Sequence, residues 1–374
     1  MPEVQEQALR QAFAGRRVLV TGHTGFKGSW LALWLDRLGA EVTGVALPPP
    51  GDRPNLFDSL RLCARVDHRI ADLRTPDELA AVLDDVDPEV VFHLAAQPLV
   101  RLSYDIPAET FLTNVVGTAR LLDFARSRPS VKAVIVVTSD KCYENVADSV
   151  WGYRESDPLG GSDPYSASKG CTELVVNAYR RSFFAADSGC TVASVRAGNV
   201  IGGGDWSEDR LLPDIMRAAF AQTPVLIRNP RSIRPWQHVL EPLTGYLQLA
   251  ANLLREGHQW AGPWNFGPDR DGLVDVGSLL DEVRRCWPAA LTIDSAREAG
   301  GRHEAHALRL DNSKAQTLLG WRPLLRLPQA VRLTVDWYRA HAAGADMAAF
   351  TLDQIDHYVG GSLMSEAAPI SEAA

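Results

Sequence analysis

Tyr165 and Lys169 stand four residues apart at the start of a helical pattern that continues to Phe184. On a helix this spacing places both side chains on one face, and Asp163-Pro164 is a typical helix start. A free phenol has a pKa of about 10, so Tyr165 can act as a base near neutral pH only where nearby positive charge favours its phenolate. The spacing indicates a proton-transfer pair, although an exposed amphipathic helix can carry the same two residues.

A glycine-rich segment, Gly22-His23-Thr24-Gly25-Phe26-Lys27-Gly28, separates the apolar run at residues 16–21 from a helical pattern at 27–38. Glycines at this spacing let the backbone turn tightly and approach a pyrophosphate, and the following helix offers free N–H groups. After the first strand of an alternating βα chain, this pattern predicts a dinucleotide cofactor rather than an ordinary turn. Lys27 is equally compatible with a phosphate contact and with a position in solvent.

The second predicted strand, residues 41–46, is followed by Leu47-Pro48. It therefore lacks both the carboxylate that usually holds the ribose hydroxyls and an arginine that would accept a 2′-phosphate. We expect NAD rather than NADP, held less tightly than usual. Asp72 is compatible with a hydrogen bond to adenine or with a place before the helix at Thr75-Pro76. The other residues expected at the cofactor are Gly22, Thr24, Gly25, Phe26, Gly28, Leu73, Leu94, Ala95, Ala96, Thr138, Tyr165 and Lys169.

Apolar runs and helical patterns alternate about five times before residue 200, which is typical of βαβ units. Strands are expected at residues 16–21, 41–46, around Ile70, 90–94, 131–138 and 191–196. Helices are expected at 27–38, 76–83, 107–126, 165–184, 211–221, 239–254, 276–286 and 328–342. The fold class is α/β, a Rossmann-type doubly wound parallel sheet with a smaller mixed α/β substrate lobe.

This pattern divides the chain into four parts. Residues 1–14 form an N-terminal arm, and 15–200 form the NAD-binding domain, to which later segments around 239–270 return. Residues 201–355 form most of the substrate lobe, and 360–374 form a flexible tail.

The composition excludes several classes of protein. The chain has 374 residues, 46% of them hydrophobic, and a net charge of −8, which argues against a disordered chain and against a basic field for nucleic acid. No apolar run is long enough to span a membrane. Five scattered cysteines without a C-x-x-C pair indicate reduced thiols in a cytoplasmic protein.

The glycine loop, Ser139, Tyr165 and Lys169 resemble the extended short-chain dehydrogenase/reductase family over about residues 15–340. Further matching segments are Thr21–Trp30, Ala95–Arg101, Ser139–Asn145, Asp163–Ser166, Arg196–Trp206 and Arg234–His238. The resemblance implies an NAD-dependent enzyme acting on a nucleotide sugar. It implies that Tyr165 removes the proton of the hexose 4-hydroxyl, Lys169 orients the nicotinamide ribose and Ser139 hydrogen-bonds the 4-oxygen.

Within this family the chain is similar to the 4,6-dehydratases, which are lyases, and the likeness implies a cytidine diphosphate hexose as substrate. By this resemblance Asp140 is the acid and Lys141 the base that remove water across C5–C6. An ordinary lysine has a pKa of about 10.4, so a lysine base must be made neutral. A surface ion pair is the alternative for Asp140 and Lys141, and a nucleotide-sugar 4-epimerase or 4-reductase is the alternative function.

The substrate's diphosphate needs cations and fixed donors. The expected substrate residues are Gln97, Asn199, Arg210, Arg234 and Arg302, although each arginine is also compatible with a surface position. His303 and His306 lack the spacing of a zinc site, so no metal is expected. The family implies a homodimer built on the helices at residues 107–126 and 165–184.

Overall fold

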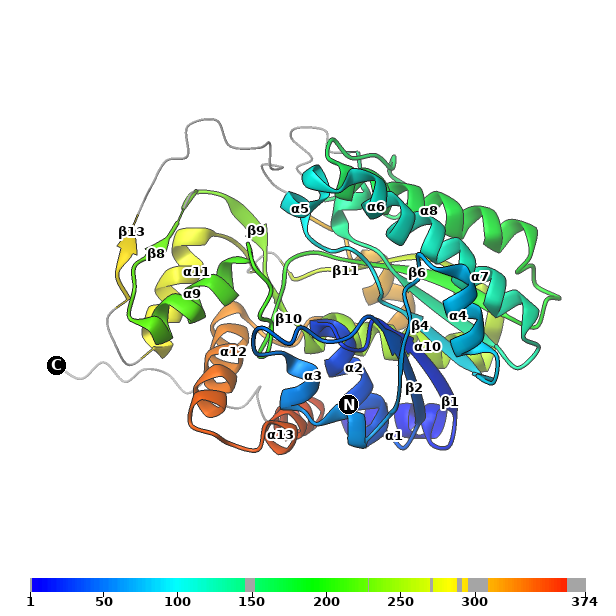
Figure 1. Ribbon diagram of the computed structural model, residues 1–374, viewed down its shortest axis with the longest axis horizontal. Coiled ribbons are helices and arrows are strands. Elements are labelled where there is room, and N and C mark those ends of the chain that lie inside the picture. Colours follow the sequence, from blue (N-terminus) through cyan, green and yellow to red (C-terminus); the bar gives the residue numbers. More distant parts are fainter. Residues whose placement is uncertain are drawn as a thin grey trace.

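The computed structural model describes residues 2–144, 152–227, 229–269, 272–287, 291–294 and 309–361 (Figure 1). The predicted substrate residue Arg302, the pair His303 and His306, and residues 362–374 of the predicted tail lie outside this part of the chain. None of the described helices is long and apolar enough to cross a membrane.

A seven-stranded parallel sheet forms the centre of the structure, in the order β11-β6-β5-β4-β1-β2-β3 (Figure 1). Its strands are β1 Arg17–Thr21, β2 Glu41–Ala46, β3 Asp67–Ile70, β4 Val90–His93, β5 Ala133–Val137, β6 Thr191–Ala197 and β11 Gly262–Phe266. The order reverses between β1 and β4, where open α/β sheets bind their ligands. This topology confirms the Rossmann-type fold that the sequence predicts.

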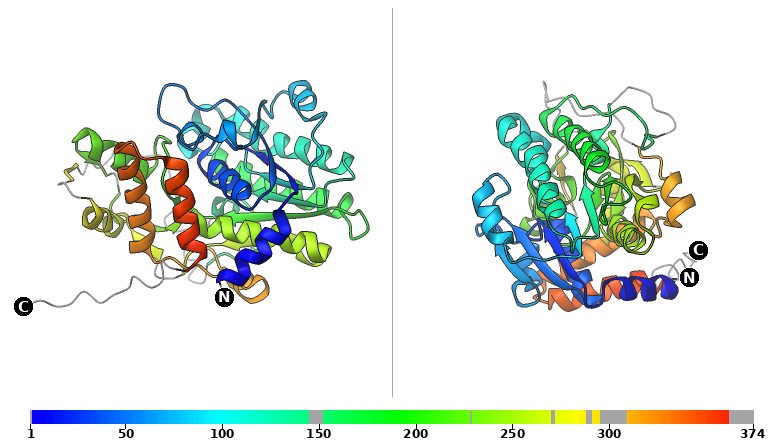
Figure 2. Two further views of the ribbon diagram at one scale, coloured as in Figure 1. Left: turned by 90° about the horizontal axis from the view of Figure 1, so that it is seen from below. Right: turned by 90° about the vertical axis from the view of Figure 1, so that its right-hand side faces the viewer.

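Helices cover both faces of the sheet (Figure 2). Successive strand residues point into the two cores in turn. In β1, Val18 and Val20 belong to the larger core and Leu19 to the smaller. The larger core is covered by α1 Pro2–Phe13, α2 Phe26–Arg37 and α10 Leu240–Glu256. The smaller is covered by α4 Pro76–Leu83, α7 Gly117–Ser127 and α8 Pro164–Ser182.

The remaining elements lie between these helices or follow β6. The helices are α3 Leu56–Ser59, α5 Val100–Asp105, α6 Pro107–Phe111, α9 Leu211–Ala221, α11 Val276–Cys286, α12 Leu327–Ala342 and α13 Met347–Val359. The short strands are β7 Val200–Ile201, β8 Val225–Leu226, β9 Ile233–Pro235, β10 Gln237–His238, β12 Leu273–Asp275 and β13 Ile293–Asp294. Single 3₁₀ turns occupy Leu62–Ala64, Asp140–Cys142 and Gly257–Trp260, and π turns Leu112–Val116 and Ala315–Leu319.

The helix predicted at residues 107–126 is wrong in one respect, because the structure divides it into α6, the π turn and α7. The carbonyl of Asn114 within this turn accepts hydrogen bonds from the hydroxyls of Thr118 and Thr172. A π turn frees backbone groups from the regular helical ladder. The turn therefore connects this segment to α8, which carries Tyr165 and Lys169.

Two helices at the ends of the described chain were not predicted. Leu9 and Phe13 of α1 are buried in the larger core, and α1 packs against α10 and α13 (Figure 2). In α13, the buried polar residues Thr351 and Gln354 interrupt the apolar pattern. The Thr351 hydroxyl accepts a hydrogen bond from the indole of Trp337 at 2.9 Å, so a polar side chain occupies a core position.

Candidate active site

The glycine loop turns so tightly that side chains are excluded at two of its positions. Gly22 has φ +77°, and a Cβ atom there would lie 2.7 Å from the Ala95 nitrogen. A Cβ atom on Gly28 would lie 2.1 Å from the carbonyl oxygen of Gly22. Helix α2 begins after Gly25 without a side-chain cap, which leaves its first N–H groups for a ligand. These features fit the pyrophosphate of a dinucleotide.

The other predicted cofactor residues surround this loop. Thr24 donates a hydrogen bond to the carbonyl of Leu47 at 2.9 Å and so joins the loop to the end of β2. Phe26 packs against Gly202, Leu73 packs against Gly117, and Leu94, Ala95 and Ala96 follow β4.

Asp72 and Thr138 are bound by neighbouring side chains. The guanidinium of Arg74 lowers the pKa of Asp72 and pairs with its carboxylate at 2.6 Å. Thr75, rather than Asp72, is the N-cap residue of α4. The Thr138 hydroxyl donates to the buried carboxylate of Glu173, so this hydroxyl is already engaged within the protein.

The residues predicted to move protons converge at the carboxyl end of β5. Ser139 caps the short turn Asp140–Cys142. Its hydroxyl donates to Asp140 at 2.9 Å and also contacts the hydroxyl of Tyr165. Tyr165 and Lys169 lie on α8 and are 8% and 5% exposed. Side chains from two separate segments, the end of β5 and the start of α8, thus meet in one buried cluster, and Lys141 follows directly after Asp140.

Burial dominates the protonation of Tyr165 and raises its pKa to about 12. The contact with Ser139 and the charge of Arg210 oppose this rise, whereas the charge of Asp140 adds to it. In the chain by itself Tyr165 is therefore a neutral phenol.

Asp140 is the most deeply buried carboxyl of the cluster, with 2% of its surface exposed. Burial raises its pKa, while Lys141, Ser139, Lys27 and Arg234 act in the opposite direction. One of its oxygens, Oδ2, is buried and has no hydrogen-bond partner among the described residues. The site can therefore keep a protonated carboxyl that is ready to donate.

A buried ion pair that the sequence analysis did not identify lies one helical turn beyond Lys169. Glu173 binds Arg196 through both carboxylate oxygens, at 2.9 and 2.8 Å, and the two side chains are 4% and 2% exposed. Arg196 also donates to the Tyr143 hydroxyl at 2.6 Å. Burial lowers the pKa of Lys169 to about 8, and Glu173 opposes that shift. The spacing of Tyr165, Lys169 and Glu173 along one helix face was the available signal.

Of the predicted substrate residues, Arg210 and Arg234 act on the proton-transfer cluster, whereas the amide of Gln97 is bound elsewhere. Arg210 immediately precedes α9, pairs with Asp205 at 2.8 Å and acts on Tyr165. Arg234, on β9, is close enough to lower the pKa of Asp140. Asn199 lies between β6 and β7 and is half-buried. The amide of Gln97 is occupied within its own segment, where it bonds to Leu99 and Thr110.

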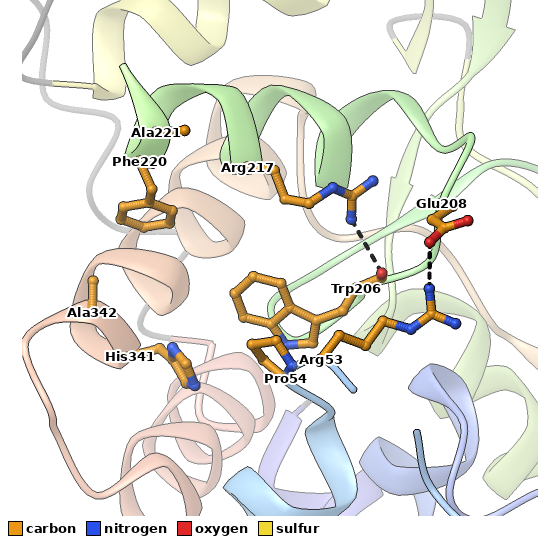
Figure 3. A pocket seen from close by; sticks show the side chains of 9 residues that line it. All are labelled: Arg53, Pro54, Trp206, Glu208, Arg217, Phe220, Ala221, His341 and Ala342. Atoms are coloured by element: carbon orange, nitrogen blue, oxygen red, sulfur yellow. Dashed lines mark hydrogen bonds and ion pairs between the residues drawn. The ribbon is translucent and has the colours of Figure 1, made fainter. Parts of the chain in front are cut away.

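Trp206 lines a cavity away from this cluster (Figure 3). This cavity has a volume of about 640 Å³ and lies between α9, α12 and the segment after β2. Its other lining residues are Arg53, Pro54, Glu208, Arg217, Phe220, Ala221, His341 and Ala342. None of the proton-transfer residues belongs to it, and Trp206 packs edge-on against Tyr338 of α12.

Comparison with known proteins places this geometry in context. Residues 18–261 match the NAD dependent epimerase/dehydratase family. CDP-glucose 4,6-dehydratase of Salmonella typhimurium is 49% identical over 354 residues, which cover 93% of this chain and 97% of that protein. dTDP-glucose 4,6-dehydratase of the same organism is 26% identical and covers 87% of this chain and 93% of its own length.

A solved structure of dTDP-glucose 4,6-dehydratase from Bacillus anthracis, in complex with NAD, shares the fold. It superposes with a TM-score of 0.72 at 19% sequence identity and covers 89% of this chain and 100% of that chain.

The buried pair predicts a large stability effect for Glu173→Gln. This change leaves the Arg196 charge buried without its counter-ion, which typically lowers the free energy of unfolding by about 3–5 kcal/mol. Urea denaturation measures the difference. Asp123→Asn, which breaks the exposed pair between Asp123 and Arg126, is the matched control and should change stability little. Equal effects of the two substitutions would contradict the role assigned to the buried pair.

Proposed function

The chain belongs to the NAD dependent epimerase/dehydratase family, and on that premise we propose that it converts CDP-D-glucose to CDP-4-dehydro-6-deoxy-D-glucose. The reaction oxidises C4, removes water across C5–C6 and reduces C6, so the enzyme is a hydro-lyase with no net redox change. The observation that carries this proposal is Asp140, which lies beside Ser139 and Tyr165 and is followed by Lys141, whose charge acts on it. The 4-epimerases and 4-reductases of the same family need no acid and base at C5–C6.

NAD is the cofactor of this family, as the sequence predicts. When bound, NAD would supply a hydride acceptor for C4 of the hexose and a hydride donor for C6. The backbone of Gly22, Gly25 and Gly28 would hold its pyrophosphate, and Lys169 its ribose. We place the reaction in the cytoplasm, which is supported by five free cysteines.

In the oxidation, Tyr165 takes the proton of the 4-hydroxyl while Ser139 holds the 4-oxygen. The phenolate that this requires is stabilised by the contact with Ser139 and by the positive charge of Arg210. Burial of the cluster excludes water that would compete for the proton.

In the elimination, the new 4-ketone acidifies the C5 proton, which Lys141 removes. Asp140 donates a proton to the departing 6-hydroxyl, so that water leaves. The raised pKa of Asp140 supports this role, because a carboxyl at its ordinary pKa of about 3.9 holds no proton at neutral pH. When C6 is reduced, the ammonium of Lys141 returns a proton to C5.

The diphosphate of the substrate is assigned to Arg210, Arg234 and Asn199. Both arginines act on the proton-transfer cluster, which places them within reach of a phosphate joined to the hexose. Arginine suits this task because its planar fork binds phosphate oxygens in pairs. Cytosine as the base is supported by the 49% identity to the Salmonella enzyme.

The direct test is incubation of the purified protein with CDP-glucose and NAD. We expect a 4-keto-6-deoxy product, detected by its ketone and its C6 methyl group in NMR spectra, with no net accumulation of NADH. Stoichiometric NADH would indicate a simple dehydrogenase instead. Recovery of CDP-galactose as the product would favour the epimerase alternative.

Lys141→Ala separates elimination from oxidation. Without the base at C5, loss of water should fall by about 100-fold or more, in the range of general base catalysis, while NAD binding stays unchanged. Product formation and cofactor affinity are measured separately. Lys132→Ala, at an exposed lysine bonded to Pro129, serves as the control. Full dehydratase activity in Lys141→Ala would refute the assignment.

We also propose that the chain forms a homodimer through α7, the preceding π turn and α8. Apolar or small side chains on α8 repeat at helical spacing on its outer side: Ala167, Cys171, Leu174 and Ala178. Leu174 is 57% exposed. On the neighbouring segment Val116 is 39% exposed and follows Leu112 by four residues. The apolar stripe on α8 and the apolar residues of the neighbouring π turn can pair with the same surface of a second copy.

Leu174→Glu tests this interface. A charge at the centre of the stripe should convert the dimer to a monomer, as measured by size-exclusion chromatography with light scattering. Leu318→Glu introduces the same charge at a leucine that is 60% exposed elsewhere on the surface, and it should leave the dimer intact. A wild-type monomer, or dissociation by both substitutions alike, would argue against the proposed interface.

A further inference from the structure

Lys27 lies where the glycine loop meets the segment that follows β7. It is the second residue of α2. The ring of the preceding residue, Phe26, packs against Gly202, and a Cβ atom on Gly202 would lie 3.0 Å from this ring. Three residues after Lys27, the indole of Trp30 donates a hydrogen bond to the carbonyl of Gly203 at 3.0 Å. The first turn of α2 is therefore fixed against the segment that carries Asp205 and Arg210.

Four charged side chains act on the Lys27 ammonium: Arg210, Asp140, Lys169 and Asp205, in decreasing order. Asp205 is already paired with Arg210 at 2.8 Å. Burial raises the pKa of Asp140, which weakens it as a counter-ion. Lys27 thus lies near two cations, Arg210 and Lys169, while one of its two acidic neighbours is already paired and the other is a weakened counter-ion. Burial and the charge of Arg210 together lower its pKa to about 7.

Such a group of cations is stabilised by an anion that two of them contact at once. Arg210 acts on the phenol of Tyr165, which the proposed reaction requires at C4 of the hexose. A phosphate joined to C1 of the same hexose is separated from C4 only by the sugar ring. The position between Lys27 and Arg210 is therefore suited to the diphosphate of the substrate.

We propose that Lys27 binds the diphosphate of the nucleotide sugar together with Arg210, so that the loop that holds the cofactor also recognises the substrate. This inference rests on the proposed function, which supplies the ligand. The same chemistry could come from a second source, the pyrophosphate of NAD, and the experiment below distinguishes the two.

The assignment has a pH signature. In the free protein Lys27 releases its proton near pH 7, whereas a bound diphosphate raises its pKa. Binding then takes up a proton above pH 7, so substrate affinity is complete below pH 7 and declines as the pH rises towards 9. The diphosphate diester keeps both charges over this range. Lys169, with a pKa of about 8, titrates in every variant below, so the difference between variants isolates Lys27.

The test is calorimetric titration of CDP-glucose into NADH-loaded protein, which cannot oxidise the hexose, from pH 6.5 to 9. Lys27→Met should weaken binding at pH 6.5 by about 10- to 100-fold, as for a lost charge-assisted hydrogen bond. It should also flatten the decline with pH. Lys27→Arg should keep the affinity but lose the decline, because arginine stays charged. Lys132→Met should behave as the wild type.

NADH affinity is measured separately by its fluorescence. If Lys27→Met weakens NADH binding and leaves CDP-glucose binding unchanged, the ammonium serves the cofactor and the proposal is overturned. Unchanged binding of both ligands at every pH overturns it as well. If Lys27→Met does not fold, the proposal is overturned by a pH profile of Lys27→Arg that is identical to that of the wild type. Wild-type protein that binds no CDP-glucose at pH 6.5 instead contradicts the proposed function, and with it the ligand assigned to Lys27.

Discussion

The buried ion pair between Glu173 and Arg196 determines how α8 sits against the sheet. Arg196 belongs to β6 and Glu173 to α8, and both carboxylate oxygens are engaged. Two charges removed from water are tolerated only in a well-defined geometry with every remaining donor satisfied. The hydroxyls of Thr138 and Ser194 donate to Glu173, and the hydroxyl of Tyr143 accepts from Arg196. One and two turns earlier on the same helix face, Lys169 and Tyr165 are consequently held beside the end of β5.

Desolvation is the second force that shapes the site. It raises the pKa of Asp140 and Tyr165 and lowers that of Lys27 and Lys169, so all four groups are driven towards their neutral forms. Neighbouring charges only partly compensate. A site in this state can hold a proton on a carboxyl and release one from an ammonium near neutral pH, which general acid–base chemistry requires. The binding of an anionic substrate changes this balance, because it supplies the negative charge that the unliganded cluster lacks.

The family shares one scaffold among several reactions. In the reaction proposed above, the glycine loop, Ser139, Tyr165 and Lys169 would serve the oxidation at C4. The proposed elimination depends instead on the pair directly after Ser139, on a turn of only three residues at the end of β5. A change of reaction therefore requires few substitutions at a position where the sheet already presents its ligands.

The sequence by itself determined the alternating α/β architecture, the glycine loop and the Tyr165–Lys169 spacing. These features depend on residues close together along the chain, where periodicity and local turns dominate. Only the tertiary structure decided which distant groups meet. Arg196 is 23 residues from Glu173 in sequence, and Arg210 acts on Lys27 across the fold. Gln97, which was expected at the substrate, satisfies its amide within its own segment. Helix α13 was not predicted, because buried Thr351 and Gln354 interrupt its apolar pattern. The physical reason is that burial and charge pairing depend on distances in space, which no local pattern in the sequence encodes.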